Sequence, residues 1–150
     1  MDSGCEARTQ AQKAAEIEEM FELFEDWSDK YQVLIDLGKD LPPMNPADKN
    51  EETRVIGCQS NVWVEAHVAQ TDIGPVVEFS ADSDAAITKG LVSILWRVFS
   101  GQPAKNILLF DIDDFIDRLG LGAHLSMQRR NGLSGMVRRI KALAASAKAT

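Results

Sequence analysis

The chain has 150 residues, of which 45% are hydrophobic and 26% are charged, and its formal net charge is −7. This length suits one compact domain with a hydrophobic core, and the apolar fraction excludes a disordered chain. The negative charge argues against a general nucleic-acid-binding role. The longest mostly apolar run, around Leu91–Phe99, is too short to span a bilayer.

The two ends of the chain differ in charge. Residues 1–30 contain nine acidic and three basic side chains, whereas residues 121–150 contain six basic and no acidic ones. The basic segment could be a solvated helix face, dock on an acidic partner or pair with the acidic N-terminal helix, and composition leaves these alternatives open. The N-terminal region lacks the basic and apolar parts of a secretion signal, so we expect a cytoplasmic protein. Residues 1–10 are expected to be a flexible leader and residues 11–150 a single domain.

Two amphipathic helices are predicted in the first 40 residues. Within residues 11–27, apolar side chains recur at helical spacing; they are Ile17, Met20, Phe21 and Phe24. Ser28 is expected to cap a second helix, for which Gly38 is a natural stop. Leu41-Pro42-Pro43 cannot continue that helix, because proline lacks the backbone N–H that a helix needs.

A β-hairpin is predicted in the middle of the chain. Apolar and other side chains alternate over residues 62–69 with the two-residue period of a strand. Residues 76–81 form a second predicted strand, antiparallel to the first, and Thr71–Pro75 form the turn between them. Arg54-Val55-Ile56 is a candidate third strand at the edge of this sheet.

The rest of the chain is predicted to be helical. Asp82-Ser83-Asp84 is a favourable start for a helix that runs to about Phe99 and is the best buried. In that helix, Gly90 is expected to let another backbone approach closely. Short helices follow near residues 103–109 and 113–119, and Ser126 is expected to cap a last helix that runs to about residue 145. The predicted fold class is α+β, with a small antiparallel sheet of about three strands and helices packed on one face.

Cys58 is the candidate reactive group. It is flanked by Gly57 and by three polar residues that can bond a turned backbone, Gln59, Ser60 and Asn61. The prediction is a thiol on a turn that leads into a strand. A lone cysteine is more often a small buried hydrophobic residue than a nucleophile. Reactivity requires a stabilised thiolate, and Arg54 is the nearest cation in the sequence.

No metal or cofactor site is predicted. The candidate metal ligands are Cys5, Cys58, His67 and His124, and their spacing does not match a zinc site. Two cysteines are too few for an iron–sulfur cluster within one chain. The chain has no phosphate-binding glycine loop, no dinucleotide-binding fingerprint and no nucleophile elbow. Both histidines are therefore interpreted as surface or packing residues.

Several motifs, in order and with matching spacing, resemble those of one family. They are Trp27–Tyr31 (WSDKY), Ile35–Pro42 (IDLGKDLP), Gly57–Trp63 (GCQSNVW), Asp82–Leu91 (DSDAAITKGL) and Arg129–Leu133 (RRNGL). They resemble the motifs of the SufE family, including its relative CsdE, whose members are sulfur-acceptor partners of cysteine desulfurases. The resemblance covers most of the chain and implies an α+β fold similar to that of iron–sulfur scaffold proteins. The predicted turn at residues 71–75 is slightly longer than is usual for the family.

The resemblance implies a function for Cys58. Cys58 would accept persulfide sulfur from a SufS- or CsdA-like cysteine desulfurase, stimulate that enzyme and pass the sulfur to an iron–sulfur scaffold. Pyridoxal phosphate belongs to the desulfurase, so this chain would need no cofactor and would be a carrier rather than an enzyme. Membrane and nucleic-acid partners are not implied, and both a monomer and a homodimer are compatible with the sequence. Six residues are candidates for supporting roles around the thiol: Arg54, Gly57, Gln59, Ser60, Asp84 and Arg129.

Several alternatives remain open from the sequence. Asp82 and Asp84 could act only as helix caps, and Arg129 could position the Cys58 loop or pair with a carboxylate. Since a persulfide is easily oxidised or reduced, the loop is expected to be shielded at rest. Cys58 could instead be the nucleophile of a self-standing sulfurtransferase that uses small sulfur donors. Alternatively, Cys58 and Cys5 together could form a redox sensor.

Overall fold

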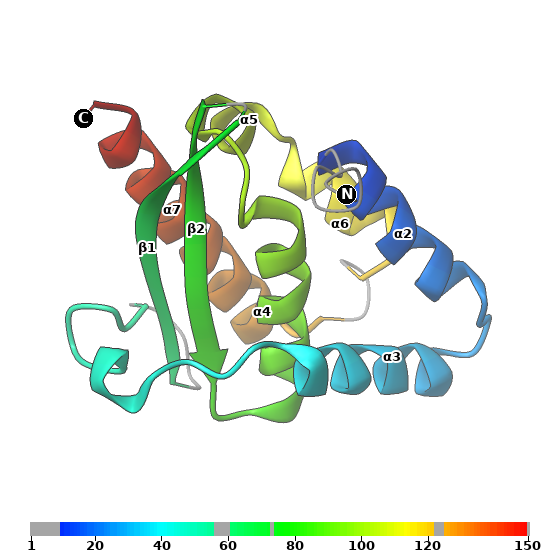
Figure 1. Ribbon diagram of the computed structural model, residues 1–150. Coiled ribbons are helices and arrows are strands. Elements are labelled where there is room, and N and C mark those ends of the chain that lie inside the picture. The colour runs from blue at the N-terminus through cyan, green and yellow to red at the C-terminus, as the bar shows by residue number, and fades with distance from the viewer. Residues whose placement is uncertain (1–9, 56–60, 73, 122–124, 150) are drawn as a thin grey trace.

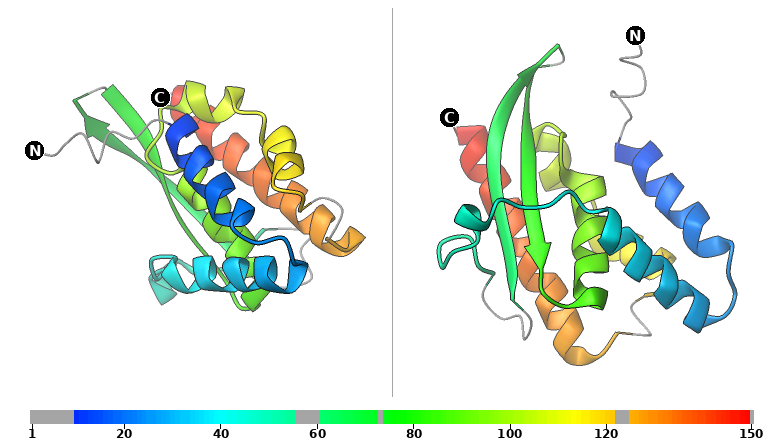
Figure 2. Two further views of the ribbon diagram at one scale, coloured as in Figure 1. Left: turned by 90° about the vertical axis from the view of Figure 1, so that its right-hand side faces the viewer. Right: turned by 60° about the horizontal axis from the view of Figure 1, so that its bottom comes forward.

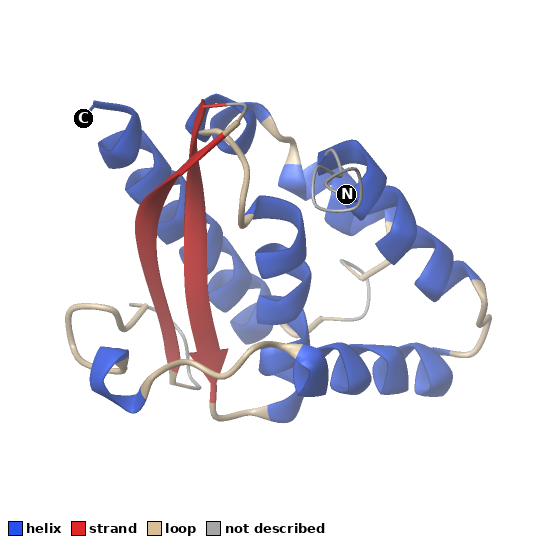
Figure 3. Ribbon diagram, viewed as in Figure 1, coloured by secondary structure: helices blue, strands red, loops and turns tan. Residues whose placement is uncertain are grey.

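The structure is a computed structural model that describes residues 10–55, 61–72, 74–121 and 125–149. Its elements are α2 (Gln10–Glu22), α3 (Trp27–Asp40), η1 (Pro46–Asp48), β1 (Val62–Thr71), β2 (Gly74–Ser83), α4 (Ala86–Phe99), α5 (Ala104–Leu109), α6 (Ile112–Arg118) and α7 (Met127–Ala149). Helices precede and follow one β-hairpin (Figures 1 and 3), which confirms the predicted α+β class. The predicted leader, residues 1–10, falls almost entirely outside the described residues.

The sheet has two strands rather than about three. β1 and β2 are antiparallel and pair from Val62 opposite Ser83 to Thr71 opposite Gly74. Within the described residues, the candidate third strand is a single bridge between Arg54 and Trp63. Only a short stretch of chain therefore extends the sheet on the β1 side.

One face of the hairpin packs on the core, as the alternation of side chains predicts. The buried residues of this face include Val62, Val64, Phe79 and Ala81. Strand β1 contacts α7, strand β2 contacts α4, and Figure 2 shows α7 running along the hairpin. The opposite face is more polar and includes Glu65, His67 and Glu78.

The turn between the strands is shorter than predicted. β1 continues to Thr71 and β2 already begins at Gly74, so most of the predicted turn belongs to the strands. Gly74 has a φ of 108°, a left-handed value that favours glycine. The Thr71 hydroxyl also donates to the Gly74 carbonyl at 2.7 Å. Turn-forming residues thus sit at the paired ends of two long strands.

Helices α2 and α3 are present as predicted, but their boundary differs. The first helix ends at Glu22 rather than near Trp27, and its buried residues are Ala14, Ile17 and Phe21. The N-cap of α3 is Asp26 rather than Ser28, because the Asp26 carboxylate accepts a hydrogen bond from the Ser28 N–H at 3.2 Å. Ser28 consequently lies inside the first turn of α3.

Helix α4 is the central helix, as predicted. Five of its hydrophobic side chains are at most 1% exposed: Leu91, Ile94, Leu95, Val98 and Phe99. Gly90 lies where α4 crosses α3, and a β-carbon there would overlap the Leu34 carbonyl oxygen and lie 2.7 Å from the Leu34 carbonyl carbon. The expected close approach at Gly90 is therefore confirmed.

The start of α4 corrects the sequence prediction. Strand β2 continues through Asp82 and Ser83, and Asp82 pairs with Trp63 of β1. The N-cap of α4 is Ala85, which makes no side-chain capping hydrogen bond. Neither Asp82 nor Asp84 caps the helix, because strand pairing extends further than the local pattern indicated.

The C-terminal helices agree with the prediction. The Ser126 hydroxyl accepts a hydrogen bond from the Arg129 N–H at 3.2 Å and so caps α7. Helix α7 continues to Ala149, beyond the predicted end near residue 145. It begins at the end of the molecule where β1 begins and β2 ends (Figures 1 and 2).

Candidate functional site

The structure describes three of the seven predicted site residues. Arg54, Asp84 and Arg129 are described. The other four lie outside the described residues, in segment 56–60: Gly57, Cys58, Gln59 and Ser60. The predicted shielding of the thiol lies outside them as well and stays a prediction. The described residues on either side show where the chain enters and leaves this segment.

The described residues on either side of segment 56–60 are held next to each other. The Val55 N–H donates to the Val62 carbonyl at 2.8 Å, and the Val64 N–H donates to the Thr53 carbonyl at 2.8 Å. Val55 and Val62 are also buried, with 4% and 0% of their surfaces exposed. Backbone pairing and burial together anchor the chain on both sides of the segment.

Asp84 binds the residue that directly follows the segment. Its Oδ1 accepts from the Asn61 N–H at 3.1 Å, and its Oδ2 accepts from the Asn61 Nδ2 at 2.8 Å. The Asp84 N–H donates back to the Asn61 carbonyl at 3.2 Å. These three bonds, here called the Asn61–Asp84 clamp, hold the start of β1 against the end of β2. Asp84 therefore lies beside the residue that follows segment 56–60, through a partner that sequence reasoning missed, and its role around the thiol stays a prediction.

The signal that could have revealed Asn61 is the strand register. Val62 pairs with Ser83, so Asn61 and Asp84 are the next residues outward on the two strands. A correct end for β2 would have placed them opposite each other.

Replacing Asp84 by alanine is expected to release Asn61. Two of the three bonds end on the carboxylate, and a net gain of about 1 kcal/mol is typical for such bonds. The amide hydrogen exchange of Asn61 should accelerate about fivefold, whereas amides inside β1 should exchange at the wild-type rate. Asp84→Asn retains one acceptor oxygen and should give an intermediate rate. Wild-type exchange at Asn61 in both variants would contradict a stabilising role of the clamp.

Asp82 is a buried carboxylate held by two lysines. Its Oδ2 lies 2.6 Å from the Lys49 Nζ and its Oδ1 lies 3.3 Å from the Lys89 Nζ. The Ser83 N–H also donates to Oδ1 at 2.8 Å. Burial on its own raises the pKa of Asp82, but the bonds from Lys49 and Ser83 and the positive charges of Lys89 and Lys49 outweigh it, so the pKa lies below its usual value.

Lys49 connects this carboxylate to Trp63 of β1. Its Nζ lies 5.4 Å from the centre of the Trp63 ring, in a cation–π contact. Trp63 pairs with Asp82 across the strands. Trp63 thus packs between Lys49 and the end of β2, two residues after Asn61. Lys49, from the polar loop before Cys58, had no predicted role.

The lowered pKa of Asp82 predicts a pH dependence of stability. The unfolded carboxyl titrates near 3.8, so between the two pKa values the unfolded state binds more protons than the folded state. The stabilisation is complete above the unfolded-state pKa and is lost as the pH falls through the folded-state pKa. Asp82→Asn should lower the free energy of unfolding at neutral pH by about 1 kcal/mol.

Urea unfolding between about pH 2 and pH 7 measures this effect. The loss of stability on acidification should be smaller in Asp82→Asn than in the wild type, because the variant has lost this titrating group. Asp113→Asn, at an exposed position of α6, is the control. Equal acid sensitivity of the wild type and Asp82→Asn would contradict the predicted contribution.

Arg54 and Arg129 occupy different surroundings. The Arg54 guanidinium lies 3.4 Å from the exposed Glu51 carboxylate. Arg129 is exposed, and no ion pair between described residues includes it. Further along α7, the Arg139 guanidinium donates to the Glu52 carbonyl at 2.8 Å and so ties the helix to the chain before Cys58. Arg129 lies ten residues earlier, about 15 Å along the helix, toward the end where β1 begins.

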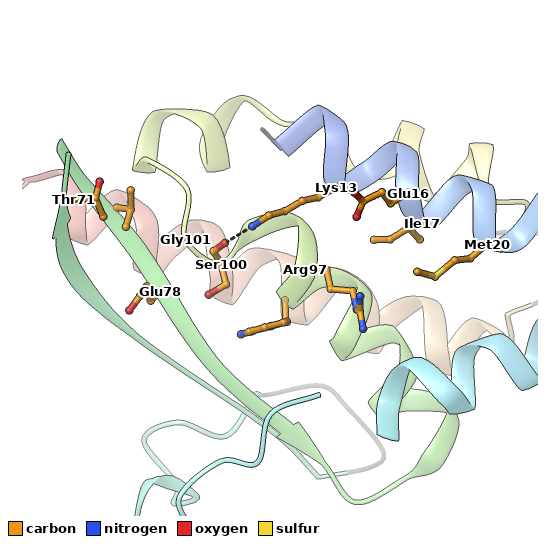
Figure 4. A pocket seen from close by; sticks show the side chains of 11 residues that line it. Lys13, Glu16, Ile17, Met20, Thr71, Glu78, Arg97, Ser100 and Gly101 are labelled. Carbon is orange, nitrogen blue, oxygen red and sulfur yellow. Dashed lines mark hydrogen bonds between the residues drawn. The ribbon is translucent and has the colours of Figure 1, made fainter. Parts of the chain in front are cut away.

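A separate cleft of about 650 Å³ lies between α2, the hairpin and the C-terminal half of α4 (Figure 4). It is lined by both cations and carboxylates, namely Lys13, Arg97, Glu16 and Glu78. Lys13 Nζ donates to the Ser100 carbonyl at 3.5 Å. The cleft includes Thr71, at the opposite end of β1 from Asn61. It is therefore distinct from the predicted thiol site.

Other candidate chemistry is limited in the described part of the chain. His67 is exposed, and its Nε2 lies 3.0 Å from Glu78 Oε1, which agrees with a surface histidine; His124 is not among the described residues. Within the described ranges, no group of three or more His, Cys, Asp or Glu side chains could hold a metal ion. Nor does any helix described there combine the length and apolar character needed to cross a membrane.

Comparison with known proteins supports the sequence resemblance. The family described as "SufE: Fe-S metabolism associated domain" matches residues 15–144. An uncharacterized SufE-like protein of Rhizobium meliloti (strain 1021) is 42% identical over 121 residues, which cover 81% of this chain and 86% of the relative. A SufE-like protein of Rhizobium etli is 40% identical over 121 residues, 81% of this chain and 82% of that relative.

The fold is also found in a solved structure. The solution structure of a hypothetical protein from Thermus thermophilus has a TM-score of 0.75 and covers 92% of this chain and 97% of its own. Its sequence identity is 23%, so the similarity concerns the fold alone.

Proposed function

The chain belongs to the SufE family, which is associated with iron–sulfur metabolism, and on this premise we propose that Cys58 accepts sulfane sulfur from a cysteine desulfurase. The protein then passes the sulfur to an iron–sulfur scaffold. It acts in the cytoplasm as a carrier, with a SufS- or CsdA-like desulfurase that supplies the pyridoxal phosphate. Removal of the persulfide frees the desulfurase for its next turnover and so stimulates it.

The proposed transfer is a thiolate exchange. The Cys58 thiolate attacks the terminal sulfur of the persulfide on the desulfurase cysteine. A sulfur–sulfur bond forms on Cys58 while the corresponding bond on the donor breaks, and the donor cysteine leaves as a thiolate. The negative charge passes from one thiolate to the other, and no external oxidant or reductant is consumed.

One observation carries the proposal: the residues that flank the Cys58 segment are anchored at one end of the molecule. Val55 is paired with Val62, and Asn61 is bound by Asp84. Helices α4 and α7 also begin at this end (Figures 1 and 2). A segment attached there can enter the active site of a partner while the sheet behind it stays intact. Positive charge, such as that of a helix N-terminus or of the exposed Arg129, would stabilise a thiolate that came close to it.

Mass spectrometry tests the proposal. The protein is mixed with a cysteine desulfurase and free cysteine, and its intact mass is measured before and after reduction. We expect the mass of one added sulfur atom, reversed by a reductant and located on Cys58 by peptide mapping. Absence of added sulfur with several desulfurases would contradict the carrier function.

A thiosulfate assay separates the carrier from a self-standing sulfurtransferase. The carrier is expected to show no multiple turnover when thiosulfate is the donor and the desulfurase is omitted. Repeated turnover by the chain alone would assign it to the enzyme class instead.

A further inference from the structure

An apolar surface lies where α2 meets α3, away from segment 56–60. Leu23 and Phe24 are 77% and 39% exposed. Five large hydrophobic residues of the described chain are exposed, and these two are consecutive. Trp27, partly exposed, follows three residues later. We call Leu23, Phe24 and Trp27 the α2–α3 corner. Single exposed hydrophobic residues are ordinary, whereas a contiguous group is typical of a contact surface.

The corner is held in place by the surrounding structure. The Phe24 N–H donates to the Phe21 carbonyl at 3.4 Å, and Asp26 caps α3. The Trp27 ring packs edge-on against Tyr31 with 5.8 Å between ring centres, and Lys30 lies over it at 5.0 Å. An ordered apolar surface loses little conformational entropy when a partner binds.

The corner is surrounded by carboxylates. The exposed acidic residues of this region are Glu19, Glu22, Glu25, Asp26 and Asp29. No ion pair between described residues includes any of these five, whereas Glu18 on α2 pairs with Arg118 of α6 at 3.0 Å. An apolar centre with an acidic rim complements a surface that has an apolar pocket bordered by Lys or Arg.

The position of the corner relates it to the thiol site. From Trp27 to Gly38, helix α3 advances about 16 Å, toward the end where β2 ends and α4 begins (Figure 2). There, a β-carbon on Gly38 would lie 3.0 Å from the Gly90 nitrogen, so α3 reaches the first half of α4. A standard interface buries about 800 Å² on each partner and is therefore about 30 Å across, which exceeds the length of α3 between the corner and Gly38.

We propose that the α2–α3 corner is a second contact for the cysteine desulfurase, through a basic surface of that enzyme outside its active site. The inference rests on the proposed function, because the same partner receives the thiol segment. Leu23 and Phe24 supply the apolar anchor, and the carboxylates steer the encounter. The corner contributes to docking and takes no part in the transfer step.

The test compares steady-state kinetics of a cysteine desulfurase with the carrier as the varied component. Leu23→Ser/Phe24→Ser should raise the KM for the carrier at least tenfold and leave kcat at saturation unchanged. Leu109→Ser is the matched control, because Leu109 is 72% exposed on α5, and it should behave as wild type. Thermal unfolding verifies that all variants are folded.

The acidic rim has its own matched pair of variants. Glu19→Gln/Glu22→Gln/Glu25→Gln should weaken the dependence of binding on salt. The triple variant Asp72→Asn/Asp113→Asn/Asp117→Asn changes the net charge equally at exposed positions elsewhere and should retain wild-type salt dependence.

The outcomes distinguish the two proposals. Wild-type KM in Leu23→Ser/Phe24→Ser would overturn the corner while leaving the carrier function intact. Sedimentation tests whether the corner instead binds a second copy of the chain. If the wild type self-associates and Leu23→Ser/Phe24→Ser does not, the corner is a contact between copies, and the inference is overturned. If the wild-type chain neither accepts sulfur nor stimulates the desulfurase, the proposed function fails, and the corner proposal fails with it.

Discussion

Cys58→Ser is expected to abolish sulfur acceptance and leave the desulfurase at its unassisted rate. The transfer requires a thiolate that forms a sulfur–sulfur bond, and a serine hydroxyl is neither ionised near neutral pH nor able to form that bond. The fold should be retained, since Val55–Val62 pairing and the Asn61–Asp84 clamp lie outside the substituted residue. Desulfurase turnover and intact mass, measured side by side with the wild type, test the prediction.

Cys5→Ser is the matched control for this experiment. Cys5 is the other cysteine of the chain and lies outside the five motifs that resemble the family. The Cys5→Ser protein should gain sulfur and stimulate the desulfurase as the wild type does. Wild-type stimulation by Cys58→Ser would contradict the acceptor role of Cys58. Loss of sulfur acceptance in Cys5→Ser would instead support the use of both cysteines.

Gly90→Ala is expected to give the largest loss of stability. The added β-carbon would overlap the Leu34 carbonyl oxygen, and backbone atoms cannot move aside as a flexible side chain can. Overpacking of this kind costs about 3 kcal/mol. The higher helix propensity of alanine returns about 1 kcal/mol, which leaves a net loss of about 2 kcal/mol.

Thermal unfolding measures this loss. For a chain of this length we expect the Tm to fall by about 4–8 °C. Ser93→Ala is the control on the same helix. Ser93 is 0% exposed, and its hydroxyl has no hydrogen-bond partner among the described residues, so removing the hydroxyl should change the Tm little. A Gly90→Ala protein as stable as the wild type would show that α3 and α4 can separate at no cost.

The close approach at Gly90 is expected to affect the candidate site as well. Lys89 precedes Gly90 in α4 and pairs with Asp82 at 3.3 Å. If α3 is displaced from α4, the first turns of α4 are expected to shift relative to the end of β2. Gly90→Ala should therefore also accelerate amide exchange at Asn61, a readout shared with Asp84→Ala.

The sequence by itself determined the fold class, the central helix and the family. Helical periodicity located α2, α3, α4 and α7, and alternation located β1 and β2, because the burial of one face imposes a regular spacing on neighbouring residues. The role of Gly90 was also predictable, since a glycine within an apolar helix indicates a close contact. The ordered motifs, including the one around Cys58, indicated the SufE family, and the match over residues 15–144 supports this assignment.

Only the tertiary structure decided the partners of the residues around the site. Asp82 and Asp84 resemble a helix start locally, yet Asp82 belongs to β2 and Asp84 binds Asn61, 23 residues earlier. Lys49 reaches Asp82 from a loop without periodic pattern. Such contacts depend on strand register and on how separate segments pack. The spacing of neighbouring residues does not predict these long-range contacts, because the contacts contribute free energy only when the separate segments meet.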